Sequence, residues 1–77
     1  MKNTIIICES GWILIGVKEN IDVGVKLENS SVVRKWTNGR GIGALSKEEY
    51  KSEYILDAIG TVIINPNKIL FEIPCEW

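Results

Sequence analysis

The chain has 77 residues, the size of one small domain, and such a domain buries only about 60% of the surface that its unfolded form exposes. Nine basic and ten acidic side chains give a formal charge of −1, which argues against a general nucleic-acid binder held by counterion release. Histidine is absent and the two cysteines show no CxxC spacing, which excludes a zinc site of ordinary composition. We therefore expect a single β-rich domain over residues 1–77 with no metal and no cofactor.

Apolar runs in the chain are short. Ile5–Ile7 is too brief for the hydrophobic region of a signal peptide, and no small-residue cleavage site follows it. No apolar run approaches the ~20 residues that a membrane-spanning helix needs. We therefore expect an intracellular protein without a membrane segment. In that compartment Cys8 and Cys75 are expected as reduced, partly buried thiols, and a disulfide between them is the alternative.

Short β-type runs alternate with turn residues along most of the chain. Ser10-Gly11 predicts a tight hairpin connection, Asn29-Ser30 a second turn and Asn65-Pro66-Asn67 a third, because proline presets φ for a turn. Pro74 ends or edges the last strand, since it cannot donate a ladder hydrogen bond. We expect six short strands, at residues 4–9, 12–18, 21–28, 32–37, 60–65 and 68–74.

One helix start is visible in the sequence. Ser46 and Glu49 form an S-x-x-E capping box, in which the hydroxyl and the carboxylate satisfy free backbone N–H groups at a helix N-terminus. The box predicts a helix of about two turns over Lys47–Glu53. The expected fold class is therefore mainly β: a small curved antiparallel sheet or barrel of about six short strands with one short helix.

Positive charge is concentrated in one part of the chain. Residues 29–47 contain no carboxylate but include Arg34, Lys35, Arg40 and Lys47, so this window carries +4 and the rest of the chain −5. Such a local field favours a small anion and disfavours long polyanions, which would meet repulsion as they extend. The alternative is that these cations lie on ordinary solvated strand and loop faces.

Three glycines at alternate positions, Gly39, Gly41 and Gly43, follow the strand that ends near Trp36 and precede the expected helix. Exposed N–H groups and the helix dipole favour an anion at such a place. Arg40 lies between the glycines and offers two parallel donors to a phosphate. The run matches neither the phosphate loop nor the dinucleotide fingerprint, and Asn38-Gly39 is also the composition of a plain turn.

Strand alternation adds two side chains to this candidate site. Arg34 and Trp36 are expected on one surface, with the indole as a face on which a purine stacks. In the alternative, Trp36 fills the interior. Trp12 is expected in the core and Trp77 at a frayed terminus. The candidate ligand-binding residues are Arg34, Trp36, Thr37, Asn38, Gly39, Arg40, Gly41 and Gly43.

Catalytic groups are few. Without histidine, a serine or cysteine nucleophile lacks its usual base. Glu48 and Glu49 are adjacent on the expected helix, where their side chains point apart and act as a negative first turn favoured by the helix dipole. We therefore expect no enzymatic activity and no catalytic residue.

Several short motifs lie between about residues 32 and 75. They are Trp36-Thr37, Gly41-Ile42-Gly43, Leu45, Tyr54-Ile55-Leu56-Asp57, Gly60-Thr61-Val62 and Ile73-Pro74-Cys75. Together these motifs resemble an uncharacterised family of short proteins encoded by bacteriophages and prophages, and the N-terminal hairpin lies outside the resemblance. The resemblance implies origin rather than activity: a small phage accessory protein acting in the host cytoplasm.

Three functions follow as hypotheses. The first is a non-enzymatic homo-oligomer that sequesters a nucleotide-type immune signal, a cyclic nucleotide or an ADP-ribose derivative, and so acts as an anti-defence sponge; the analogy is to positively charged pockets with a stacking aromatic. The second is a protein-interaction module that inhibits a host or defence protein, with Trp36, Arg34 and Arg40 as anchors. The third is a single-stranded nucleic-acid binder, although long nucleic acid is not an expected partner.

Overall fold

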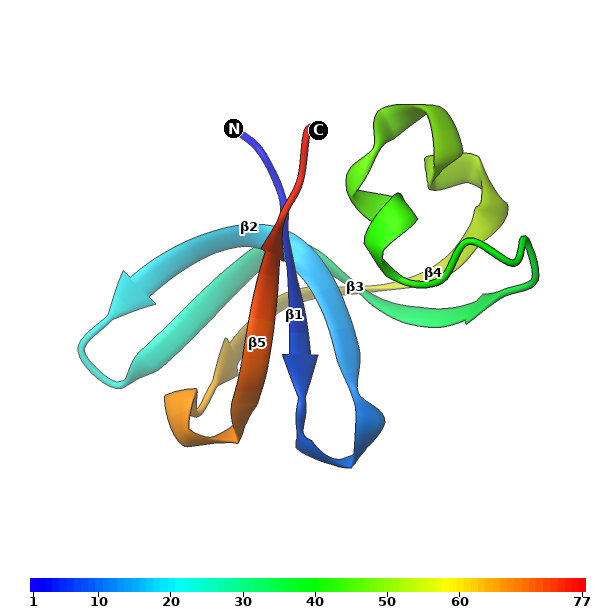
Figure 1. Cartoon of the computed structure of the whole chain (residues 1–77). Coiled ribbons are helices and arrows are strands. Elements are labelled where there is room, and N and C mark those ends of the chain that lie inside the picture. Colours follow the sequence, from blue (N-terminus) through cyan, green and yellow to red (C-terminus); the bar gives the residue numbers. More distant parts are fainter.

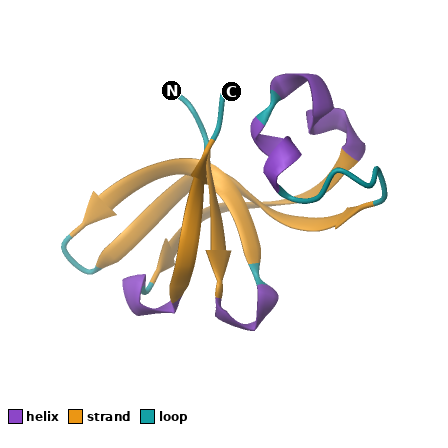
Figure 2. Cartoon of the chain, viewed as in Figure 1, coloured by secondary structure: helices purple, strands orange, loops and turns teal.

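A computed structural model describes all 77 residues and contains five antiparallel strands in one unclosed sheet (Figures 1 and 2). The strand order is β4-β3-β2-β1-β5, so β4 and β5 are the two edges. The expected mainly β, curved antiparallel sheet is confirmed, and it does not close into a barrel. The strands are β1 (Thr4–Cys8), β2 (Ile13–Ile21), β3 (Gly24–Trp36), β4 (Tyr54–Ile64) and β5 (Ile69–Pro74).

The strand count differs from the expected six because β3 runs through the expected turn at Asn29-Ser30. Asn29 has a φ of 49°, in the left-handed region, and the register of β3 against β4 shifts at this point. Ser30 is buried, and its hydroxyl donates a hydrogen bond to the Gly60 carbonyl of β4. Asn29-Ser30 is therefore a β-bulge inside a long strand and not a turn between two strands.

The helical segments are short 3₁₀ turns, and the expected helix is wrong in type. The Ser46 hydroxyl donates back to the Gly43 carbonyl at 2.8 Å, so it does not cap the segment that follows. Lys47 occupies the cap position without a side-chain hydrogen bond. The turns are η1 (Glu9–Gly11), η2 (Gly43–Ser46), η3 (Glu48–Glu53) and η4 (Pro66–Lys68).

The sheet buries apolar side chains on both faces, which is why β1 reads as a continuous apolar run. Side chains alternate along a strand, so Ile5 and Ile7 join one cluster whereas Ile6 and Cys8 join the other. The first cluster is Ile5, Ile7, Ile15, Val33, Leu45, Tyr54 and Cys75. The second cluster is Ile6, Cys8, Leu14, Val25, Leu27 and Ile64.

The turns η2 and η3 cover the first cluster, and the C-terminus holds them in place. Leu45 of η2 is fully buried there. The Glu76 N–H donates to the Ser46 carbonyl at 2.8 Å, and the Trp77 indole N–H donates to the Leu45 carbonyl at 2.8 Å. Trp77 is therefore anchored rather than frayed. The two chain ends lie side by side (Figure 1), joined by a hydrogen bond from the Asn3 N–H to the Trp77 carbonyl at 2.7 Å.

The strands β2 and β3 approach each other closely at Gly16. A Cβ atom at Gly16 would lie 2.9 Å from the Ser30 Cβ and 3.0 Å from the Glu28 carbonyl oxygen. The register of β2 against β3 also shifts between Ile15 and Val17. Glycine at position 16 therefore lets the two backbones come together at a β-bulge, where a strand bends locally.

Candidate functional site

The glycine segment, residues 39–43, forms a loop that follows β3 and leads into η2. Gly39 and Gly41 have φ values of 73° and 77°, and no heavy atom lies within 4 Å of a Cβ built on either residue. The Asn38 side-chain oxygen accepts a hydrogen bond from the Arg40 N–H at 2.9 Å, which forms an Asx turn. The glycines thus supply the left-handed backbone of a turn that is open to solvent on its outer side.

Arg40 already has partners in this loop. Its Nε atom donates to a carboxylate oxygen of Glu53 at 3.1 Å, and that oxygen also accepts from the Asn38 side-chain amide at 2.8 Å. The guanidinium carbon lies 4.0 Å from the centroid of the Tyr50 ring, a cation–π geometry. A phosphate at this loop would therefore have to compete with Glu53 for Arg40.

Trp36 packs against the first cluster and against Tyr54, which contacts the loop. Its ring centroid lies 5.7 Å from that of Tyr54, with a tilt of 38° between the planes. The Tyr54 hydroxyl donates a hydrogen bond to the Gly41 carbonyl, so the same aromatic pair fixes the loop to β4. Trp36 is half-buried, with one side packed on the core, which agrees with the alternative that it packs in the interior.

Arg34 and Trp36 do not share a surface, in contrast to the simple alternation of a strand. Arg34 pairs with Asp57 at 2.8 Å, and Asp57 lies opposite Val32, which packs against the second cluster. Trp36 lies opposite Tyr54 of the first cluster. The register shift between Val33 and Lys35 inserts Arg34 as an extra residue and reverses the alternation.

The remaining candidate residues complete this picture. Thr37 is exposed beside the loop, and Gly43 begins η2, where its carbonyl accepts from Ser46. The structure therefore brings Trp36, Asn38, Gly39, Arg40 and Gly41 together and leaves Arg34 apart. Neither of the two hollows of the structure is lined by any of the eight predicted residues.

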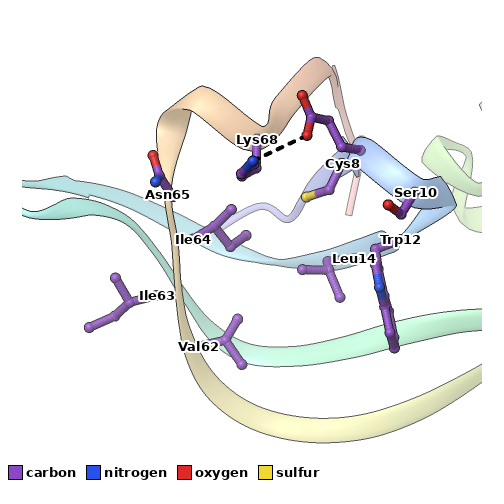
Figure 3. A pocket seen from close by; sticks show the side chains of 10 residues that line it. Cys8, Ser10, Trp12, Leu14, Val62, Ile63, Ile64, Asn65 and Lys68 are labelled. Atoms are coloured by element: carbon purple, nitrogen blue, oxygen red, sulfur yellow. Dashed lines mark hydrogen bonds and ion pairs between the residues drawn. The ribbon is translucent and has the colours of Figure 1, made fainter.

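The larger hollow lies at the other end of the sheet, between η1, η4 and the end of β4, and has a volume of about 450 Å³ (Figure 3). We call it the η1–η4 hollow. Its floor is apolar and consists of Leu14, Val62 and Ile64 together with the Cys8 thiol. Burial raises the pKa of that thiol, so Cys8 contributes an inert, neutral surface. These residues come from three strands that meet only because the sheet curls.

Trp12 forms one wall of the η1–η4 hollow. Its side chain stands upright beside Leu14 and Val62 (Figure 3), and the residue is 59% exposed. The expectation that Trp12 packs in the core is therefore wrong. The reason is its position: it follows the η1 turn, where Ser10 and Gly11 both have positive φ, and so it lies at the rim of the second cluster rather than inside it.

The rim of the hollow is polar. Lys68 of η4 pairs with Glu9 of η1 at 3.4 Å, which spans the two turns (Figure 3). The Asn65 side-chain oxygen caps η4 by accepting from the Asn67 N–H at 3.0 Å. The arrangement is an apolar floor, an aromatic wall and a rim whose charges neutralise each other. No signal in the sequence joins these residues, because Trp12 and Val62 are fifty positions apart.

Other kinds of site are not formed. No group of three or more histidine, cysteine, aspartate or glutamate side chains lies close enough to hold a metal ion. None of the helical turns is long and apolar enough to cross a membrane. Comparison with protein-family models, with curated proteins and with solved structures gives no match to this chain.

Proposed function

We propose that this chain is a non-enzymatic binding protein and that the η1–η4 hollow is its binding site. The observation that carries the proposal is Trp12, which is 59% exposed at the edge of an unfilled apolar hollow of about 450 Å³. Ligand pockets in proteins are concave, mostly apolar and about 300–1,000 Å³ in volume, with a few polar groups at fixed places. The hollow meets each of these conditions.

The chemistry of the other side chains supports binding rather than catalysis. The sequence has no histidine, and burial raises the pKa of both thiols, Cys8 and Cys75, which disfavours the nucleophilic thiolate. Eight of the ten carboxylates are held in ion pairs, which leaves only Asp22 and Glu49, on separate segments, without one. No pair of unpartnered carboxylates remains for general acid–base chemistry.

The experiment uses the neutral apolar dye Nile red, whose fluorescence rises in an apolar site. The wild-type protein is expected to bind one dye per chain. Trp12→Ala removes the wall and Val62→Phe fills the floor, so both are expected to weaken binding by about tenfold or more. The matched control is Val23→Ala, which removes an apolar side chain that is 75% exposed in the β2–β3 turn, outside the hollow. Equal binding by all four proteins would reject the proposal.

A second candidate function is sequestration of a nucleotide-type immune signal by the glycine segment. The observation that favours it is the Arg40 guanidinium, whose side chain is 45% exposed and stacked on Tyr50 beside the open outer sides of Gly39 and Gly41. Under this candidate, Glu53→Gln removes the competing carboxylate and is expected to strengthen binding of cyclic dinucleotides or ADP-ribose about tenfold. Calorimetric titrations that show no binding to either protein would reject it.

The biological setting rests on the sequence resemblance alone. Under this proposal the protein is a phage accessory protein that acts in the host cytoplasm, where a small binding protein works by stoichiometric capture. The interaction-module alternative requires a partner protein at the anchors Arg34, Trp36 and Arg40. Of these, Trp36 packs against the core and both arginines are held by carboxylates, which favours the η1–η4 hollow as the binding surface.

A further inference from the structure

The occupant of the η1–η4 hollow can be described more closely, and this inference rests on the proposed function. We propose that the hollow binds a small, flat, uncharged and mainly apolar molecule that stacks against Trp12. Three features carry the proposal: the shape of the aromatic wall, the cancelled charge at the rim, and the narrow extent of the apolar surface around the opening.

The first feature is the wall. The Trp12 indole is planar and faces a space whose opposite side is formed by the end of β4 and whose floor is Leu14 and Val62 (Figure 3). Planar rings bind an indole by offset stacking with centroids about 4.5–7 Å apart, whereas a branched aliphatic group touches only part of its face. A flat ligand therefore covers the largest share of the exposed indole and displaces the water next to it.

The second feature is the charge of the rim. Lys68 and Glu9 pair with each other, and no other charged residue lines the hollow. A charged ligand would have to separate this pair or remain unpaired next to an apolar floor, which costs free energy in either case. Two neutral groups at the rim, the Ser10 hydroxyl and the Asn65 side-chain nitrogen, make no hydrogen bond within the chain and are free for polar atoms of an uncharged ligand.

The third feature is the limited extent of the apolar surface. A stable protein–protein interface covers about 800 Å² per partner, roughly a sixth of the 4787 Å² surface of this chain. The opening of the hollow is bounded by the Glu9–Lys68 pair, by polar turn residues, and by only two exposed apolar side chains, Trp12 and Ile63. The exposed apolar residues Leu70 and Phe71 lie on β5 and line neither hollow. This geometry fits a small molecule that enters the hollow better than a broad protein surface that covers it.

The test uses three probes with the same ring system and different charge: indole, which is neutral, indole-3-acetate, which is anionic, and tryptamine, which is cationic. Each displaces bound Nile red from the wild-type protein in a competition titration. Indole is expected to compete at least about tenfold better than either charged probe, because it leaves the Lys68–Glu9 pair intact. In Trp12→Ala, indole is expected to lose about tenfold in affinity through the lost stacking, whereas Val23→Ala leaves the affinity unchanged.

A preference for either charged probe would overturn the uncharged-ligand inference, and the rim would then bind an ion by opening its pair. If Nile red binding depends on Trp12 and Val62 but none of the three probes competes, the proposed function stands and the inference of a flat, uncharged ligand fails. If Nile red binding does not depend on these two residues, the proposed function and this inference fail together. A Lys68→Met, Glu9→Gln double variant keeps the hollow without the pair and is expected to reduce the discrimination among the three probes.

Discussion

The Nε atom of Arg40 donates a hydrogen bond to a carboxylate oxygen of Glu53 at 3.1 Å, across the loop that joins β3 to the 3₁₀ turns. Glu53 lies just outside the carboxylate-free window of residues 29–47, and it neutralises the charge at the centre of that window. Asp57 does the same for Arg34, and Glu76 for Lys47. Three of the four cations of the positive segment are therefore in ion pairs in the folded chain, and Lys35 is the exception.

Arg40→Ala tests how this arrangement contributes to stability. Its ion pair is solvent-exposed and is worth at most about 1 kcal/mol, and the stack on Tyr50 adds about 0.5–1 kcal/mol. The matched control is Arg34→Ala, which loses an exposed ion pair to Asp57 without an aromatic stack. Urea denaturation is expected to show the larger loss for Arg40→Ala. An equal or larger loss for Arg34→Ala would contradict the role of the stack.

Substitution by alanine is expected to destabilise the protein at Gly16 but to have little effect at Gly43. At Gly16 the added methyl group meets the Ser30 Cβ at 2.9 Å, so Gly16→Ala forces β2 and β3 apart and is expected to lower the free energy of unfolding by about 1–3 kcal/mol. At Gly43 no heavy atom lies within 4 Å, so Gly43→Ala is expected to change it by about 0.5 kcal/mol or less. Thermal unfolding of the two variants measures the contrast. Similar melting temperatures would show that β2 and β3 do not approach each other closely at Gly16.

The Lys47–Glu76 pair makes the attachment of the C-terminus dependent on pH. The hydrogen bond from Lys47 lowers the pKa of Glu76 and raises the pKa of Lys47. A lowered carboxyl pKa stabilises the fold above the unfolded value of about 4.3, and this contribution is lost as the pH falls through the folded value. The raised Lys47 pKa contributes at neutral pH and is lost only in the alkaline range.

An NMR titration of the Glu76 carboxyl carbon measures this effect directly. In Lys47→Met the pKa of Glu76 is expected to rise, because its main hydrogen-bond donor is gone. The amide signal of Glu76, which donates to the Ser46 carbonyl, is expected to broaden at a higher pH in the variant than in the wild type. An unchanged pKa would mean that Lys47 does not hold Glu76 in solution.

The two thiols are free and buried in the structure and lie in different clusters, Cys8 in the second and Cys75 in the first. Burial raises the pKa of each thiol, so little thiolate is present at neutral pH. Labelling by a disulfide reagent is expected to be slow in the native protein and fast in urea. Rapid native labelling of both thiols would show that the clusters open readily.

Self-association is a further prediction, and the strand order identifies where it would occur. β4 and β5 are unpaired edges, and β5 exposes Leu70 and Phe71. An exposed apolar edge strand is a surface on which a second copy pairs in an isologous dimer. Light scattering at tens of micromolar is expected to give about twice the chain mass, and Phe71→Lys to give the monomer. A monomer for the wild type would contradict the prediction.

Local patterns in the sequence predicted the sheet well but gave no sign of the η1–η4 hollow. The apolar run of β1 and the turn residues near positions 10 and 66 depend on neighbouring residues, and these elements were confirmed. The capping box failed because Ser46 ends η2, so Lys47 takes the cap position before η3. Asn29-Ser30 failed because a bulge has the same composition as a turn.

The η1–η4 hollow depends on the whole fold. Trp12 and Val62 line the same hollow because the sheet is curved, and no spacing in the sequence encodes this proximity. The exposure of Trp12 depends likewise on the two positive φ angles in η1. Periodicity describes the faces of single strands, whereas a cavity between distant strands follows from their curvature.

The most direct measurement of the central claim is a two-dimensional NMR titration of the ¹⁵N-labelled protein with indole. The account predicts that the largest shift changes fall on the Trp12 indole N–H and on backbone amides that line the η1–η4 hollow, near Cys8 and from Val62 to Asn65. Signals of the glycine segment, residues 39–43, should stay in place. Shift changes concentrated in residues 39–43, with the Trp12 signal unmoved, would contradict the account and make the glycine segment the binding site.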